Sequence, residues 1–198
     1  MTGSVLYEGK EVQSLSIQEL ARKISVVLTD TSSVADMSVH ELVSLGRIPY
    51  TNYIGTLTAA DKDVVRRSME IMGIETFAGR NISTLSDGER QKCMIAKAFA
   101  QQTATILLDE PTAFLDYPSK VQFFRTLKRL ATEENKAMIV STHDLELALR
   151  LADKVWLMND GSLTAGTTPQ LSASGALQRF INDDSITYDA KGNRIEIR

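Results

Sequence analysis

The chain has 198 residues, of which 43% are hydrophobic and 24% charged, a balance typical of a globular protein with a buried core. With a net charge of −3, the chain is not expected to attract nucleic acid or anionic lipid. Its one cysteine, Cys93, excludes an intrachain disulfide, and no apolar run is long enough for a membrane span or a signal peptide. We therefore expect a cytoplasmic protein that does not bind nucleic acid, with Cys93 as a small buried side chain.

The first predicted elements are a short helix and a strand. Ser16 and Glu19 have the spacing of a capping box, in which each side chain binds the backbone N–H of the other residue. Residues 24–28 follow as a continuous apolar run with one serine, which predicts a buried strand.

Residues 29–100 show a helical pattern that no strand signal interrupts. Ser38 and Glu41 form a second capping-box pattern, and Thr58 precedes a run with apolar residues at helical spacing. His40 falls in the first turn of a predicted helix, where we interpret it as a solvated side chain. This stretch is expected to form a helical subdomain.

From residue 105 onward, strands and helices alternate. We predict strands at 106–108, 137–140 and 155–158 and helices at 119–134 and 145–152, with hairpin turns at 159–162 and 190–193. This alternation is typical of a parallel sheet covered by helices. The simplest division is an α/β core of residues 1–29 and 101–198, with the helical subdomain of residues 30–100 inserted into it.

Two adjacent carboxylates, Asp109 and Glu110, follow the strand at 106–108. They could be only the polar end of a strand. However, the carboxyl end of a parallel strand faces the crevice where such sheets bind ligands. A nucleotide hydrolase needs one acid there for magnesium and a second group to orient the attacking water. Pro111 then ends the strand.

The segment Ser86, Asp87, Gly88 and Glu89 begins a predicted helix. Ser86 and Glu89 fit a capping box, which is a structural role. The same helix N-terminus offers free N–H groups to an anion, and Gly88 would let a phosphate approach the backbone closely. Both roles can hold together.

Two further polar residues also have two interpretations. His143 comes just after the strand at 137–140, so it is expected at a carboxyl end, although a lone histidine is more often structural. Asp116 precedes Pro118 and a helix, where it fits an N-cap or an Asx turn.

Taken together and in this order, these segments resemble the ATPase subunit of an ATP-binding cassette transporter. The resemblance implies a P-loop NTPase (RecA-like) α/β fold with an inserted α-helical subdomain. It implies ATP and Mg²⁺ as cofactors, with Asp109 on the magnesium side, Glu110 as general base and His143 on the terminal phosphate. Ser86 to Glu89 would bind the nucleotide of the opposite subunit, and Asp116 would lie at the dimer seam.

The chain departs from the family in two places. The phosphate loop G-x-x-x-x-G-K-[ST] is absent, and residues 5–12 match the segment that follows the phosphate-loop helix. We therefore expect a chain that lacks the N-terminal phosphate-loop strands, by nature or by gene calling. The family's glutamine after the strand at 24–28 corresponds to Thr29, which reaches less far. Either Asp30 replaces it, or the coupling between nucleotide and transporter differs.

By resemblance, the protein is the ATP-binding and ATP-hydrolysing subunit of an importer of iron-siderophore, haem or cobalamin-type cargo. The likeness to this group of importers lies in three segments, which are residues 45–49, residues 175–180 and the turn around Asp116. The implied partners are a second copy, arranged head to tail, and a membrane permease. The expected location is the inner face of the cell membrane.

Two alternatives stay open. The chain could be a soluble cassette ATPase that acts on ribosomes or DNA, although fused cassettes or inserted coils, which are usual there, are not visible. It could also be a fragment without ATPase activity, because ATP loses its main anchor without the lysine and amides of the phosphate loop.

Overall fold

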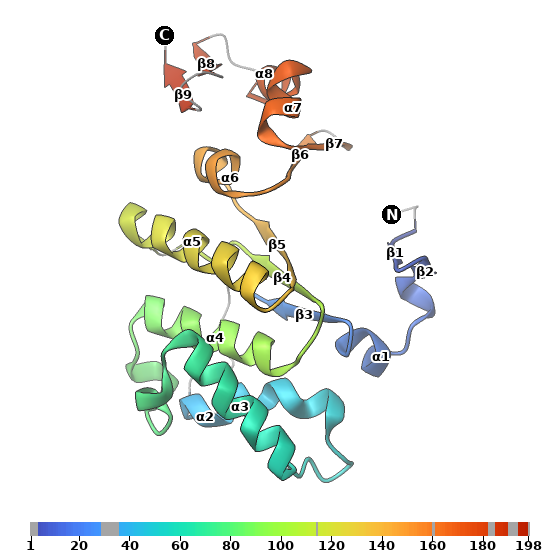
Figure 1. Cartoon of the computed structure of the whole chain (residues 1–198), viewed down its shortest axis with the longest axis vertical. Helices are drawn as coiled ribbons and strands as arrows, with labels where there is room; N and C mark the ends of the chain where they lie inside the picture. Colours follow the sequence, from blue (N-terminus) through green and yellow to red (C-terminus); the bar gives the residue numbers. More distant parts are fainter. Residues whose placement is uncertain are drawn as a thin grey trace. The chain divides into compact units, whose positions relative to one another are not determined.

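The computed structural model describes residues 4–28, 36–113, 115–159, 161–181, 185–189 and 194–197. The chain divides into two compact units (Figure 1), which are treated separately below. The first contains Met1–Lys120 and Leu130–Ser141, and the second contains Val121–Arg129 and Thr142–Arg198.

A three-stranded parallel sheet forms the centre of the first unit. Its order is β3 (Ile24–Val27), β4 (Thr105–Asp109) and β5 (Ala137–Ser141), so the predicted strands at 24–28, 106–108 and 137–140 are confirmed. Alternate residues on the middle strand, Ile106 and Leu108, are almost fully buried. The opposite face is partly open, since Val26 is 47% exposed and Ile139 is 40% exposed.

A small hairpin and a short helix precede the sheet. The hairpin pairs β1 (Leu6–Tyr7) with β2 (Lys10–Glu11), and its turn residues Glu8 and Gly9 both have positive φ, which suits a tight two-residue turn. A 3₁₀ turn, η1 (Val12–Ser14), leads to α1 (Ile17–Ala21). The hydroxyl of Tyr7 lies 3.2 Å from that of Thr105, which joins the hairpin to the sheet.

The three α-helices that follow β3 in the sequence pack together (Figure 1). They are α2 (Val39–Ser44), α3 (Ala59–Met72) and α4 (Asp87–Ala100), with 3₁₀ turns η3 (Leu45–Tyr50), η4 (Glu75–Phe77) and η5 (Ile82–Thr84) between them. Helix α4 is central, because it contacts α2, α3 and β3 and buries seven of its residues, Cys93 among them.

The capping boxes predicted at α1, α2 and α4 are confirmed, and α3 begins with a fourth, formed by Thr58 and Asp61. His40 is exposed in the first turn of α2, as expected. Helix α5 (Tyr117–Glu133) occupies the predicted position and buries Phe124, Leu127 and Leu130, which follow one another at three-residue spacing.

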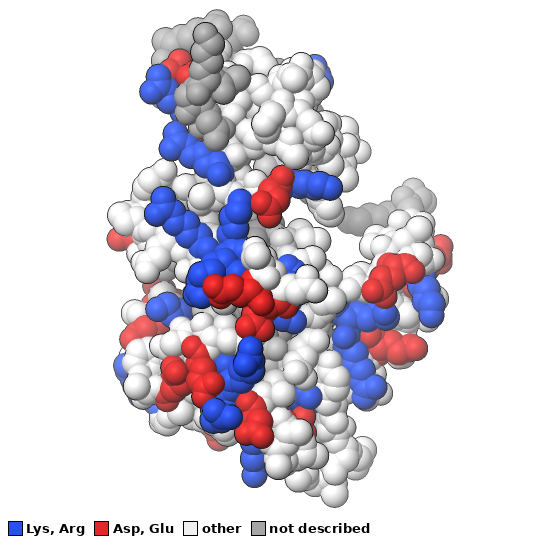
Figure 2. All heavy atoms as spheres, viewed as in Figure 1, with Lys and Arg blue, Asp and Glu red and all other residues white. Residues whose placement is uncertain are grey.

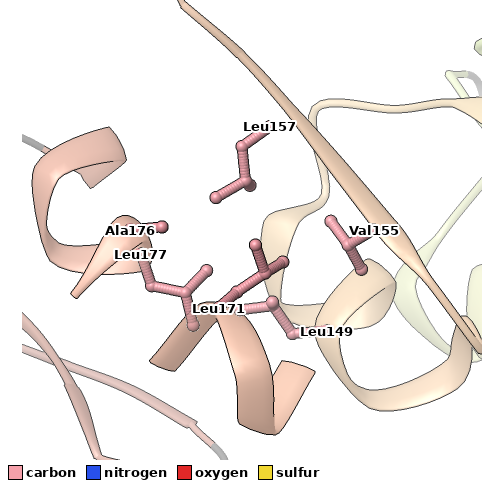
Figure 3. Packing of buried hydrophobic residues seen from close by; sticks show 6 residues of the cluster. All are labelled: Leu149, Val155, Leu157, Leu171, Ala176 and Leu177. Atoms are coloured by element: carbon pink, nitrogen blue, oxygen red, sulfur yellow. The ribbon is translucent and has the colours of Figure 1, made fainter. Parts of the chain in front are cut away.

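The second unit has its own small core (Figure 3). Its elements are α6 (Leu145–Leu151), β6 (Val155–Asn159), β7 (Ser162–Gly166), α7 (Thr168–Ala173), α8 (Ala176–Ile181), β8 (Ile186–Asp189) and β9 (Arg194–Ile197). Leu149, Leu157 and Leu171, from a helix, a strand and a second helix, meet in this core.

Strand β6 covers the predicted strand at 155–158 and pairs with β7 in an antiparallel ribbon, so the hairpin turn predicted at 159–162 is confirmed. Gly161 in this turn has φ +76°, a conformation that glycine adopts readily. The predicted turn at 190–193 lies outside the described residues, although β8 and β9 on either side of it pair. The boundaries of the helical subdomain at residues 30 and 100 stay a prediction.

Charged side chains of both signs are interspersed on the face shown in Figure 2, without one continuous basic or acidic area. Among the described residues, none of the helices combines the length and the apolar character that a membrane span requires.

Candidate functional site

The carboxylates of Asp109 and Glu110 stand where the middle strand of the sheet ends. Asp109 is the last residue of β4, its side chain is exposed, and its register partner is Ser141, the last residue of β5. The Ser141 hydroxyl donates to Asp109 Oδ1 at 2.7 Å and accepts the N–H of Glu110 at 2.9 Å. One serine thus contacts both acidic residues.

Glu110 has an unusual backbone conformation. Its φ is +40°, in the left-handed region that residues with a side chain rarely adopt. Such a conformation costs on the order of 1 kcal/mol and is typically retained where the surrounding structure and function require it. It turns the chain sharply out of β4, so that the Ala113 N–H reaches the Glu110 carbonyl at 3.2 Å.

The chain then turns again and starts α5 at Asp116. The side chain of Asp116 accepts the N–H of Ser119 at 2.9 Å, so the N-cap interpretation is confirmed. Hydrogen bonds from the side chain and backbone of Ser119 lower the pKa of the Asp116 carboxyl. The proposed place of Asp116 at a dimer seam is a separate matter and stays a prediction.

At the start of α4, Ser86 and Glu89 hold each other in place. Glu89 Oε2 accepts both the N–H and the hydroxyl of Ser86 at 2.8 Å, and the Glu89 N–H binds the Ser86 hydroxyl at 3.3 Å. These bonds from the backbone and side chain of Ser86 lower the pKa of Glu89. The box leaves other first-turn N–H groups of the fourteen-residue helix available to an anion.

Gly88 lies in this first turn without a steric need for glycine. Within the described part of the chain, a Cβ added there would contact Leu115 Cδ2 alone, at 3.9 Å, and the φ of Gly88 is not positive. Since glycine also weakens a helix relative to alanine, neither packing nor helix stability explains its presence here. The contact with Leu115 also places this turn beside the segment between Glu110 and Asp116.

His143 belongs to the second unit, two residues beyond the end of β5. Its side chain is exposed and its carbonyl accepts the N–H of Leu145 at 2.9 Å, while Thr142 Oγ1 accepts the N–H of Asp144 at 3.0 Å. These bonds form the turn that leads into α6. Thr29 and Asp30 lie outside the described residues.

The oxygen ligands at the end of β4 fit Mg²⁺. Among residues described by the structure, no three carboxylate, histidine or cysteine side chains cluster as a metal site. Mg²⁺ does not require such a cluster, because it usually binds one or two carboxylates, water and substrate phosphates. The exposed Asp109 carboxylate, with one oxygen oriented by Ser141, has the chemistry of that protein ligand.

Comparison with known proteins decides the family. The profile of the ABC transporter family matches residues 1–113, more than half of the sequence. The chain belongs to the ABC transporter family. It is 40% identical over 168 residues to an uncharacterized ABC transporter ATP-binding protein of Methanocaldococcus jannaschii, covering 85% of this chain and 58% of that protein.

Two import proteins are also similar. A cobalamin import ATP-binding protein of Halobacterium salinarum is 38% identical over 96% of this chain and 46% of its own length. The iron(3+)-hydroxamate import ATP-binding protein of Bacillus subtilis is 31% identical over 97% of this chain and 72% of its own length. The chain thus spans about half the length of the first curated relatives it matches.

The fold agrees with this assignment. A metal-chelate type ABC transporter in an inward-facing conformation superposes with a TM-score of 0.77 at 26% identity, covering 89% of this chain and 73% of that one. The chain therefore has the predicted P-loop NTPase fold class. The roles of its individual site residues remain predictions.

The sequence did not predict that the Ser141 hydroxyl binds both Asp109 and Glu110. A signal was present, because Ser141 is the first polar residue after the apolar run at 137–140. Parallel strands bring such residues side by side, but the register that pairs Asp109 with Ser141 is set only in the folded sheet.

Proposed function

We propose that this chain is part of the ATP-binding and ATP-hydrolysing subunit of an ABC importer. The observation that carries the proposal is the pair Asp109 and Glu110 at the end of β4, with Glu110 turned into the left-handed region and both residues bound by Ser141. Paired acids at this edge of a parallel sheet fit the binding and hydrolysis of a nucleotide.

Each acid has its own role in this proposal. Asp109 holds Mg²⁺, directly or through water, beside the nucleotide phosphates. When bound, the ion neutralises charge that develops on the phosphate oxygens. Glu110, half-buried one residue later, accepts a proton from the attacking water and orients it, which is the work of a general base. His143 contacts the terminal phosphate.

The first turn of α4 provides the second half of the site. Ser86, Asp87, Gly88 and Glu89 bind the nucleotide held by a second copy of the subunit, arranged head to tail. The helix N-terminus and the unobstructed backbone at Gly88 support this role. Asp116 follows Leu115, whose Cδ2 lies beside Gly88, and is proposed to lie at the seam between the copies. Thr29 is proposed to touch the metal.

The cargo class is proposed from the relatives. Proteins that import cobalamin and iron(3+)-hydroxamate are similar along nearly the whole chain. We therefore place this subunit on the cytoplasmic face of a membrane, bound to a permease that carries iron-siderophore, haem or cobalamin-type cargo. The phosphate-loop motif does not occur in these 198 residues, so hydrolysis needs a phosphate cradle that they do not supply.

The test begins with the coding DNA upstream of Met1, read in the same frame for G-x-x-x-x-G-K-[ST]. The protein from the complete open reading frame is then assayed for Mg²⁺-dependent ATP hydrolysis, alone and with its permease. Glu110→Gln should lower kcat by about 10²–10⁴-fold, the usual contribution of a general base, with nucleotide affinity retained. Glu133→Gln, at the far end of α5, is the control and should leave kcat unchanged.

If the complete protein does not hydrolyse ATP, with or without the permease, the proposed function is wrong. If Glu110→Gln keeps more than a third of the wild-type kcat, Glu110 is not the general base. A complete frame without a phosphate loop would favour a binding role for the chain.

A further inference from the structure

We propose that Ser141 is a positioning residue that fixes both acids of the site, Asp109 and Glu110. The inference rests on the proposed function. It starts from two hydrogen bonds on one hydroxyl, the bond donated to Asp109 Oδ1 at 2.7 Å and the bond accepted from the Glu110 N–H at 2.9 Å.

The chemistry of a serine hydroxyl makes this pair of bonds directional. The group has one proton to donate, and an ionised carboxylate can only accept, so the proton is directed to Asp109. The lone pairs of the oxygen are then available to the N–H of Glu110. Donating to a charged acceptor strengthens the first bond relative to one between neutral groups.

The first bond orients the Asp109 carboxylate. Binding Oδ1 restricts rotation of the side chain, so the second oxygen takes a defined direction from the sheet edge. A ligand that is already oriented loses less conformational entropy on binding Mg²⁺, and partners of this kind commonly change metal affinity or activity by about 10–100-fold.

The second bond acts on the backbone of Glu110. At φ +40° this residue departs from the strand conformation, and its N–H binds a side chain of the neighbouring strand instead of continuing the ladder. The Ser141 oxygen therefore supports a conformation that is intrinsically unfavourable. Because φ sets the direction of Cβ, this bond also fixes the direction in which the Glu110 side chain leaves the backbone.

A purely structural role for Ser141 predicts a different result. The Ser141 side chain is exposed and the β4–β5 pairing retains its other register pairs without it, so loss of the hydroxyl should cost little stability. A structural role would change the melting temperature and kcat together. A positioning role changes kcat while the melting temperature stays nearly constant.

The experiment compares Ser141→Ala and Ser141→Thr in the protein from the complete open reading frame. Threonine keeps a hydroxyl on the same strand position, so it should restore function. Ser162→Ala is the matched control, because Ser162 is also an exposed serine at a strand end and its hydroxyl binds the Asn159 carbonyl at 2.6 Å. Three readouts are taken: kcat and KM for ATP, amide hydrogen exchange at Glu110, and the melting temperature.

For Ser141→Ala we expect kcat to fall about 10–100-fold with KM within about twofold, and the Glu110 amide to exchange at least tenfold faster. Ser141→Thr and Ser162→Ala should stay close to wild type in all three readouts. An alanine variant with kcat within twofold of wild type would overturn the positioning role, as would a threonine variant that is as slow as alanine.

Failure of the proposed function gives a different pattern. If the wild-type protein does not hydrolyse ATP, the positioning role in catalysis fails with it. Amide exchange separates the two cases, because it does not depend on hydrolysis. Unchanged Glu110 exchange in Ser141→Ala would overturn the inference even in an active enzyme.

Discussion

Arg47 and Asp61 form a buried ion pair in which Nε lies 2.9 Å from Oδ1 and both side chains are less than 10% exposed. The second arm of the guanidinium, through Nη1, also donates to the Ala100 carbonyl and to the Gln102 side chain, each at 2.8 Å. The centre of the Tyr50 ring lies 4.1 Å from the guanidinium carbon of Arg47. One side chain thus links η3, the start of α3 and the end of α4.

Arg47→Ala should destabilise the protein by about 3–5 kcal/mol, because it leaves the Asp61 carboxylate buried without its cation. Urea unfolding followed by circular dichroism measures the change. Arg66→Ala is the control, since Arg66 forms exposed pairs with Asp63 and Glu70 and its loss should change stability little. Equal effects of the two substitutions would contradict the structural role assigned to Arg47.

Gly88→Ala should separate folding from activity. The added methyl group has room and improves helix propensity, so the free energy of unfolding should stay the same or rise by up to about 1 kcal/mol. If Gly88 lets a phosphate approach the helix N-terminus, kcat/KM for ATP should fall at least tenfold. Gly79→Ala, where a Cβ meets no atom within 4 Å, should leave both quantities unchanged. A fully active Gly88→Ala protein would remove the phosphate-contact role.

Stability should fall as the solution is acidified. Hydrogen bonds from Ser16, Ser38 and Ser86 lower the pKa values of Glu19, Glu41 and Glu89, and bonds from Thr58, followed by Arg47, lower that of Asp61. A lowered native pKa means that the unfolded chain binds more protons. The stabilisation is therefore complete above the ordinary carboxyl pKa of about 4 and is lost as pH falls through the native values.

The triple variant Glu19→Gln, Glu41→Gln and Glu89→Gln tests this dependence. Glutamine still accepts the N-cap N–H but does not titrate, so the variant should lose less stability than wild type between about pH 5 and pH 3. Glu75→Gln, an exposed residue outside these boxes, should follow the wild-type curve. The quantity measured is the urea midpoint at each pH, and parallel curves for wild type and triple variant would refute the prediction.

Residues 1–198 alone should bind apolar dyes through the open face of the sheet. Val26 and Ile139 are 47% and 40% exposed there, which is unusual for strand residues of this type. Val26→Thr with Ile139→Thr should reduce dye fluorescence and aggregation without a lower melting temperature, since threonine keeps the preference for strands. Ile54→Thr, in an exposed loop, is the control. A cooperative melt at an ordinary domain temperature with no dye binding would contradict this expectation.

The sequence by itself determined what depends on near neighbours along the chain. The boxes at Ser16, Ser38 and Ser86 could be predicted because their partners lie three residues away. The hairpin turn at 159–162 could be predicted because only a few consecutive residues form it. The candidate acids Asp109 and Glu110 could be found in the same way, since they directly follow an apolar strand.

Only the tertiary structure decided the contacts between distant segments. Gly46 has no room for a Cβ against the Lys97 carbonyl and Ala100, which allows η3 to approach α4 closely, and Arg47 reaches across to residue 100. The bridge from Ser141 to Asp109 and Glu110 spans about thirty residues and depends on strand register. Such contacts depend on how whole elements pack, which local periodicity and spacing do not encode.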